Sequence, residues 1–210
     1  MARLAKLVVA GLAIAGLIAI CAAIWLMAGG TGARQAPSAA ETRMARALRR
    51  FATPADARRR RNPVPADSAA IADGKAHFAD HCATCHANDG SGDTLFGRGM
   101  YPRPPDLRLD ATQKMTDGEL FYVIEHGVRL TGMPAFGEGT PESETASWRL
   151  VHFIRHLPKL TDSEREEMRR LNPKSPDEWR EEEAMRRFLE GKDPKPAPAK
   201  PRHTHKHGGH

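Results

Sequence analysis

The stretch Cys82-Ala83-Thr84-Cys85-His86 is the most informative part of this sequence for the fold, because the expected helices and loops can be placed relative to it. Two thiols are separated by two residues, and an imidazole directly follows the second thiol. A chain with this order can attach haem: each thiol adds to one vinyl group of the porphyrin, and the imidazole becomes an axial ligand of the iron. The motif therefore predicts one covalently bound haem c, attached at Cys82 and Cys85 and ligated by His86.

A Cys-x-x-Cys pair can also be a redox dithiol or half of a zinc site. A tetrahedral zinc site needs a second pair of ligands. The one other cysteine, Cys21, lies in an apolar run, and no second Cys or His pair follows at finger-like spacing. A thioredoxin-like dithiol is expected beside a strand-helix-strand pattern, whereas the sequence around Cys82 alternates between loops and helices. The haem interpretation is favoured over both.

Three helical segments are expected over residues 65–160. Apolar residues recur at helical spacing from Ile71 to Cys82, so the first helix runs into the haem motif, and Gly74 leaves room for another helix to cross it closely. A capping box over residues 116–119 predicts a second helix that ends at Gly127. An apolar stripe over residues 148–157 predicts a third. The pattern indicates an all-α domain of three main helices and long loops.

Residues 65–160 resemble the class I mono-haem cytochromes c. The resemblance rests on the first helix, the haem motif, the segment Gly132-Met133-Pro134 and a last helix that carries Trp148 and Phe153. It implies the cytochrome c fold, in which the first and last helices cross nearly at right angles and the loops line the haem pocket. It covers less than half of the chain, and residues 1–30, 31–64 and 161–210 lie outside it.

The N-terminal segment, residues 1–30, is expected to be an uncleaved transmembrane signal-anchor. Residues 7–28 are an unbroken apolar or small run, long enough to cross a hydrocarbon core, whereas the apolar part of a cleaved signal peptide is usually about 7–15 residues long. Arginines after the run outnumber the charges before it and favour a cytoplasmic domain. The resemblance implies haem attachment outside the cytoplasmic membrane, so we expect a single span with the haem domain on the periplasmic side.

Residues 31–64 are expected to be a linker rich in Arg, Pro and Ala, with a short helix over residues 41–51. They carry nine basic and two acidic side chains, whereas residues 65–160 carry nine basic and thirteen acidic ones. Basic charge can indicate nucleic-acid binding, but an exported chain does not routinely meet nucleic acid, and we expect no such partner. Arginines 58–61 either contact anionic lipid head groups or are solvated.

Met133 is the expected second axial ligand. A thioether is a soft, uncharged ligand that favours ferrous iron and raises the potential, and Gly132 and Pro134 suit a tight loop; the alternative is a packed core residue. Met100 and Met115 are expected to pack. No iron ligation is expected from the histidines on or beside helices, which are His77, His81, His126, His152 and His156.

The proline-rich stretch 99–107 is expected to complete the haem pocket. A carbonyl of Pro102, Pro104 or Pro105 is a candidate acceptor for the His86 Nδ1–H. The candidates to meet the haem propionates are Tyr101, Arg98 and Arg103. The alternative for each residue is a rigid turn without haem contact.

Residues 161–210 are expected to form a charged helical extension and a His-rich tail. Capping boxes at 161–164 and 175–178 predict two helices, the second over residues 176–190. We expect the second helix to pack on the domain through Trp179, Phe188 and Leu189, as a brace or a partner-docking element. A flexible tail can bring several imidazoles onto one copper, zinc or nickel ion; the candidate ligands are His203, His205, His207 and His210, and the alternative is a polar tail without specific affinity.

Together these features predict a membrane-anchored c-type cytochrome that passes single electrons between a protein donor and a protein acceptor. It makes and breaks no substrate bond, and no catalytic residue is expected. Two alternatives stay open. One is an anchored subunit of a larger oxidoreductase, and the other is a haem protein with a displaceable Met133 that acts on peroxide or small gases.

Overall fold

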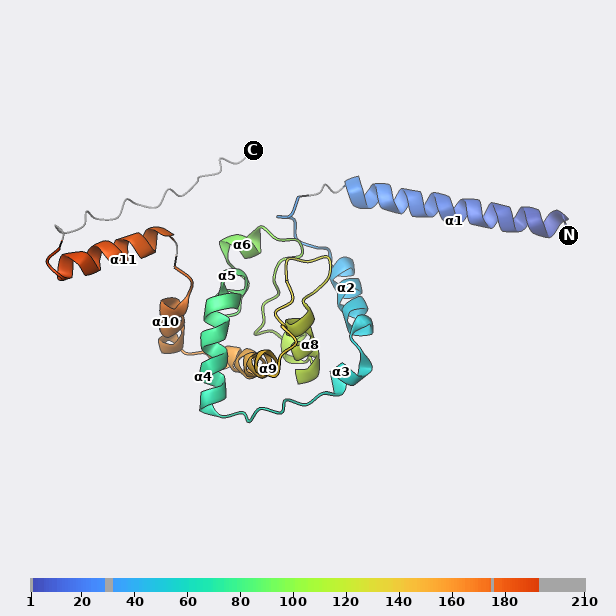
Figure 1. The fold of residues 1–210 in the computed structure, drawn as a ribbon. Coiled ribbons are helices and arrows are strands. Elements are labelled where there is room, and N and C mark those ends of the chain that lie inside the picture. The colour runs from blue at the N-terminus through green and yellow to red at the C-terminus, as the bar shows by residue number, and fades with distance from the viewer. Residues whose placement is uncertain (1, 29–31, 175, 193–210) are drawn as a thin grey trace.

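The computed structural model of the chain describes residues 2–28, 32–174 and 176–192, and every regular element within these ranges is a helix (Figure 1). The elements in chain order are α1 (Ala2–Ala28), α2 (Ala39–Ala52), α3 (Ala55–Arg59), α4 (Ser68–His77), a π-helical turn η1 (Phe78–Cys82), α5 (Ala83–His86), α6 (Leu95–Arg98), α7 (Asp110–Gln113), α8 (Asp117–His126), α9 (Pro141–His156), a 3₁₀ turn η2 (Leu157–Lys159), α10 (Asp162–Leu171) and α11 (Pro176–Leu189). The all-helical class expected from the sequence is confirmed.

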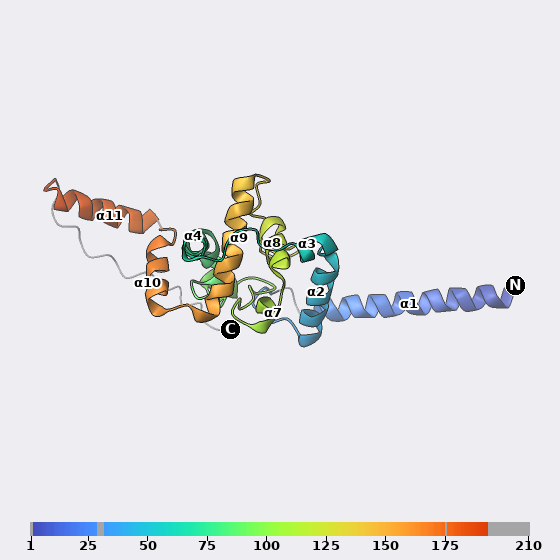
Figure 2. The same ribbon diagram turned by 90° about the horizontal axis from the view of Figure 1, so that it is seen from below.

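The crossing of α4 and α9 is the centre of the body. Figure 1 shows α4 along its length and α9 nearly end-on, and Figure 2 reverses the two, so the helices cross steeply. At the crossing, a Cβ on Gly74 would lie 2.2 Å from the carbonyl oxygen of Arg149. Only glycine permits this approach, as the sequence predicted.

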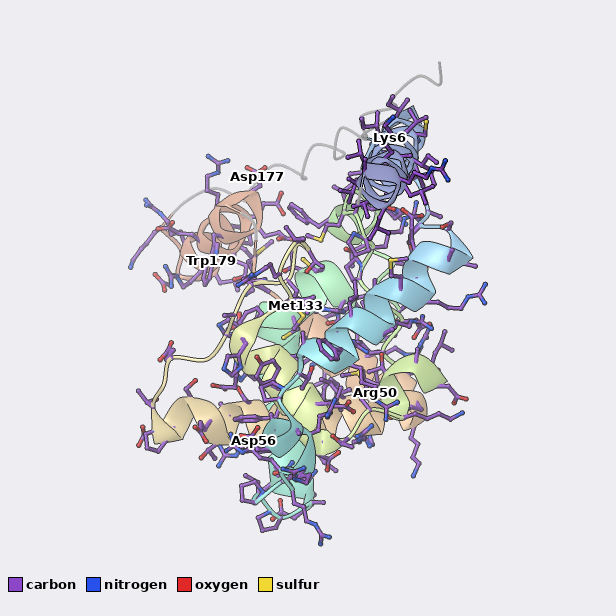
Figure 3. The ribbon with its side chains drawn as sticks, turned by 90° about the vertical axis from the view of Figure 1, so that its right-hand side faces the viewer. Lys6, Arg50, Asp56, Met133, Asp177 and Trp179 are labelled. Carbon is purple, nitrogen blue, oxygen red and sulfur yellow. The ribbon has the colours of Figure 1, made fainter. Side chains whose placement is uncertain are left out.

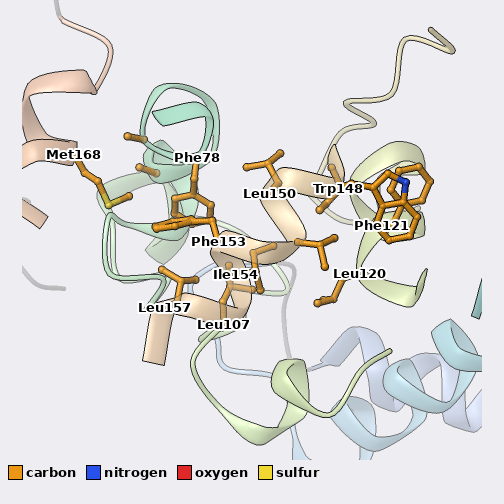
Figure 4. Close-up of a cluster of buried hydrophobic side chains, with 14 residues drawn as sticks. Phe78, Leu107, Leu120, Phe121, Trp148, Leu150, Phe153, Ile154, Leu157 and Met168 are labelled. Atoms are coloured by element: carbon orange, nitrogen blue, oxygen red, sulfur yellow. The ribbon is translucent and has the colours of Figure 1, made fainter. Parts of the chain in front are cut away.

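The core lies along the inner side of α9 (Figure 4). Phe78 packs on Phe153 with ring centroids 5.2 Å apart, and Phe121 stacks on Trp148 at 4.0 Å. All four rings are buried almost completely. The first pair joins α9 to the turn before the haem motif, and the second joins it to α8, so one helix holds both sides of the body together.

The signals for the ends of α8 are confirmed. Thr116 and Glu119 form the expected capping box, and Gly127 ends the helix with φ +65°. Helix α9 begins at Pro141, seven residues before the apolar stripe that predicted it, with the Thr140 hydroxyl as its N-cap. Its first turns are polar and exposed or half-buried, so hydrophobic periodicity did not reveal them.

Part of the segment expected as a linker packs on the body. Thr53 and Ala57 are buried, and a Cβ on Gly118 of α8 would lie 2.0 Å from the carbonyl oxygen of Ala57. The Arg60 guanidinium lies 4.4 Å from the centroid of the Phe121 ring and pairs with Glu144 at 3.0 Å. These contacts are made by small residues, backbone atoms and an arginine. Such contacts leave no periodic apolar pattern in the sequence, so they could not be predicted from it.

Helix α10, and not α11, packs on the body. Its capping box at Thr161 and Glu164 is confirmed, Met168 is fully buried, and Glu167 accepts a hydrogen bond from the buried Lys75. The expected packing of α11 is wrong for two of its three residues: Trp179 is 59% exposed and Leu189 is 77% exposed, whereas Phe188 is half-buried. The expected capping residue Ser175 lies outside the described residues, as does the tail with its four histidines.

Helix α1 is long and apolar enough to cross a membrane. Residues Ala2–Ala22 have a mean hydropathy of 2.4, and no part of this stretch is buried against the rest of the chain. Its length and composition are compatible with an anchor.

Candidate haem-binding site

The haem motif lies at the end of a continuous helical segment. Helix α4 passes into the π-helical turn η1, which ends at Cys82, and α5 then carries Ala83–His86. A π turn inserts one extra residue per turn and is frequent at functional sites. Ala87 has φ +60° and ends the helix directly after His86. The two cysteines and the histidine therefore lie close together on consecutive helical residues, and the helix ends directly after His86.

The His86 imidazole is prepared to act as a metal ligand. Burial lowers its pKa to about 4, so the ring is neutral near pH 7. Its Nδ1 atom is buried and has no hydrogen-bond partner. The expected hydrogen bond to a proline carbonyl is thus not formed in this structure. A buried nitrogen without a partner is costly. The neutral form of the ring is the form that can give a nitrogen lone pair to a haem iron.

The two cysteines are free thiols held in protonated form. Burial raises the pKa of Cys82 to about 12, with a smaller contribution from Cys85, and burial also raises the pKa of Cys85. A reactive redox dithiol requires a lowered pKa, so the environment disfavours that alternative. Neutral thiols beside a neutral imidazole fit thioether attachment of haem.

The loop after the motif binds the backbone of its last residues. The Gly92 N–H donates to the carbonyl of His86 at 2.8 Å, and the Thr94 hydroxyl donates to the carbonyl of Cys85 at 3.4 Å. The carbonyl oxygen of Pro104 lies only 2.5 Å from where a Cβ on Gly92 would be. The proline stretch therefore contacts the loop that holds the motif, although its expected acceptor role is not seen.

Arg108 forms a network of ion pairs that no pattern in the sequence predicted. Arg108 pairs with Asp89 at 2.9 Å and with Asp106 at 2.7 Å. Hydrogen bonds from Arg108 lower the pKa of Asp106. Burial alone would raise the pKa of Asp89, but hydrogen bonds from Ser91 and the charge of Arg108 bring it below its ordinary value. The network joins the loop after the motif to the segment after the prolines.

Met133 lies on a loop of the body, half-buried (Figure 3). Its N–H donates to the Thr131 hydroxyl at 3.1 Å, and its carbonyl accepts from the Val128 N–H at 3.1 Å. A Cβ on the neighbouring Gly132 would lie 2.9 Å from the sulfur of Met100. The structure therefore brings the loops of two methionines together, which their spacing in the sequence did not indicate. Met115 packs against the core, as expected.

The three residues expected near the propionates each have another partner. Tyr101 donates to Glu41 at 2.8 Å, Arg98 pairs with Asp93 at 2.7 Å, and Arg103 donates to the Arg34 carbonyl at 3.2 Å. Their contact with haem stays a prediction, and so does that of Pro105.

The other histidines are held by contacts within the protein. His152 bonds to the Val64 carbonyl at 2.8 Å, and His156 to Glu164 at 2.9 Å. His126 bonds to the carbonyl of Tyr122, and His77 packs edge-on against His81. In the part of the chain that the structure describes, no group of three or more His, Cys, Asp or Glu side chains is arranged to hold a metal ion.

Comparison with known proteins adds one match. No curated protein matches the chain. The family described as cytochrome C oxidase, cbb3-type, subunit III matches residues 69–154, a range that runs from α4 into the last turn of α9 and includes both the haem motif and Met133. The chain therefore carries, over residues 69–154, a cytochrome c domain of the cbb3-type subunit III family, which implies a covalent haem c and a role in electron transfer.

Proposed function

We propose that this protein is a membrane-anchored electron carrier with His86 and Met133 as the axial ligands of its haem. Bound haem c supplies a one-electron Fe(III)/Fe(II) couple. The chain supplies two thiols for attachment, a neutral imidazole and a thioether. The observation that carries the proposal is the neutral, largely buried imidazole of His86 directly after the protonated thiols of Cys82 and Cys85 in the matched domain.

The choice of Met133 over Met100 rests on how its loop is held. Hydrogen bonds on both sides of Met133 fix its backbone, and a Cβ on Gly127 would lie 2.7 Å from its carbonyl oxygen, so the end of α8 packs tightly against it. A ligand on a fixed loop loses little conformational freedom when it binds. Met100 follows α6 and contacts Gly132 by its side chain.

Anchoring by α1 and a periplasmic position of the haem domain belong to the same proposal. The support is the apolar, unburied α1 and the covalent haem that the domain implies. Protein redox partners on that side of the membrane are the expected donor and acceptor.

Methionine substitutions test the ligation. We expect Met133→Ala to lose the methionine–iron charge-transfer band of the ferric protein and to bind carbon monoxide after reduction. Met100→Ala, on the adjacent loop, is the matched control and should keep the band and exclude the gas. Loss of the band in Met100→Ala alone would assign the ligand to Met100. Gas binding by the unsubstituted protein would instead favour the alternative of peroxide or gas chemistry.

A role as a subunit of a membrane oxidase is a second candidate function. It is favoured by the matched family and by α11, which projects from the body (Figure 1) and exposes Trp179 and Leu189. Copurification with an oxidase in mild detergent, lost on Trp179→Ala and Leu189→Ala substitution, supports this role. A chain that purifies alone under the same conditions argues for the free carrier.

Copper or zinc binding by His203, His205, His207 and His210 stays a prediction of the sequence. Calorimetric titration of the full chain with each metal tests it. Affinity no better than millimolar would end the hypothesis of a metal-carrying tail.

A further inference from the structure

Helix α2 carries an apolar stripe that nothing in the described structure covers. Met44, Leu48 and Phe51 follow each other at spacings of four and three residues, so they share one side of the helix. Their exposed fractions are 64%, 60% and 88%. Large apolar side chains aligned in this way mark an interaction surface.

The opposite side of α2 is turned to the body. Arg49 is half-buried. Burial lowers its pKa, and the negative charge of Glu119 in α8 partly offsets this by raising it. The helix is fixed near both ends: Glu41 accepts a hydrogen bond from Tyr101, and the carbonyl of Arg50 accepts one from Arg58 at 2.7 Å. The apolar stripe therefore points away from the body, and a rotation that buried it would break these contacts.

Basic residues occupy another side of α2, away from the stripe. Arg43, Arg46 and Arg50 share a side with Ala39, and among the described residues none of the three arginines forms an ion pair. The one acidic residue of α2, Glu41, is engaged in the capping box with Ser38. The surface thus combines an apolar stripe with a strip of positive charge.

We propose that α2 lies in the membrane interface, with Met44, Leu48 and Phe51 in the boundary between head groups and acyl chains and the long arginine side chains of the basic side reaching the phosphates of anionic lipids. Helices that lie on membranes have this combination of an apolar face and a basic face. The inference rests on the proposed anchoring by α1. Ten residues separate the end of α1 from the start of α2, and they span at most about 35 Å, so an anchored α1 holds α2 close to the bilayer.

An interfacial α2 would also orient the haem domain. The Tyr101–Glu41 hydrogen bond joins α2 to the proline-rich stretch, and Thr53 and Ala57 after α2 are buried in the body. The same side of the body would then always face the lipid. The opposite side would be presented to soluble or protruding redox partners.

Thiol labelling of the full haem-loaded chain in nanodiscs tests the proposal. Leu48→Cys places a thiol on the apolar stripe, and Ala39→Cys places one on the basic side of the same helix. The native Cys21 thiol in α1 reports whether the anchor is inserted, and Cys82 and Cys85 are occupied by haem. A charged maleimide is applied to each variant in discs of phosphatidylcholine with phosphatidylglycerol and in discs of phosphatidylcholine alone, and each labelled peptide is quantified by mass spectrometry.

We expect Cys21 to be protected and position 48 to be labelled at least about tenfold more slowly than position 39 in the anionic discs. Adding Arg43→Gln and Arg46→Gln, or removing phosphatidylglycerol, should reduce the difference to about twofold or less.

Equal rates at positions 48 and 39 with Cys21 protected would overturn the inference and leave the anchoring intact. Rapid labelling of Cys21 would overturn the anchoring, and this inference with it. Protection of position 48 that arises only after solubilised native membranes are added would assign the stripe to a protein partner and also overturn the inference.

Discussion

Gly74 is a position at which the absence of a side chain decides the fold. A Cβ there would lie 2.2 Å from the Arg149 carbonyl, so α4 and α9 would have to separate. We expect Gly74→Ala to lower the free energy of unfolding by about 1–3 kcal/mol or more, measured by denaturant titration of the haem-loaded protein. Gly99→Ala is the control, because its new Cβ would be no closer than 3.4 Å to any neighbour. Equal losses in both variants would contradict the proposed importance of the crossing.

The Arg108 network should make stability depend on acid. Hydrogen bonds from Arg108 depress the pKa of Asp106 in the folded state, so their stabilisation is fully present above the unfolded pKa and is lost as the pH falls through the folded pKa. Arg108→Met should therefore cost about 1 kcal/mol at pH 7, after allowance for solvent screening, and clearly less in strong acid.

Urea titrations of the unsubstituted protein and of Arg108→Met over a range of pH measure how the loss of unfolding free energy changes with pH. The exposed pair of Lys114 and Asp110 provides the control, and Lys114→Met should have no measurable effect. A cost for Arg108→Met that does not change with pH would show that packing, and not charge, is responsible.

At the scale of elements, α10 is part of the folded body and α11 is not. Met168 of α10 is fully buried, whereas Met185 of α11 is 43% exposed. Met168→Ala should cost about 2–5 kcal/mol because it leaves a cavity, and Met185→Ala should change the free energy of unfolding by less than about 0.5 kcal/mol. Thermal unfolding followed by circular dichroism compares the two, and a similar loss for both would mean that α11 is also packed.

The elements that the sequence predicted carry local signals. The capping boxes at Thr116 and Thr161 and the stop at Gly127 each act within a few residues, and each is found at its expected place. The axial role of Met133 stays a prediction, because only the domain, and not its ligation, is matched.

The elements that the sequence did not predict depend on contacts between distant segments. Ala57 meets Gly118 through a backbone carbonyl, Arg60 stacks on Phe121, and Met100 lies against Gly132. Each involves single small or charged residues without periodicity, so hydrophobic pattern cannot reveal them. Met168 is the only fully buried apolar side chain that the structure describes in α10, which explains why a charged sequence concealed a packed helix.

At the scale of the whole molecule, the C-terminal boundary of the folded unit should lie after α10. Removing residues 175–210 should leave the haem spectrum and the unfolding midpoint unchanged, because the large apolar residues Trp179, Met185 and Leu189 of α11 are exposed. Removing residues 161–210 also deletes Met168 and the Glu167 partner of Lys75 and should lower the midpoint. Absorption spectra and thermal scans of the two shortened proteins check this, and equal midpoints would contradict the boundary.

The burial of Thr53 and Ala57 has a consequence for the kinetics of electron exchange. Because the chain joins the body there, an α1 inserted in the membrane as proposed would keep the carrier within a thin layer above the lipid. Encounters with a partner in the same membrane would then be governed by lateral diffusion and by the number of molecules per unit area. Turnover should accordingly follow the surface density of the protein in a vesicle and be insensitive to the dilution of the vesicles.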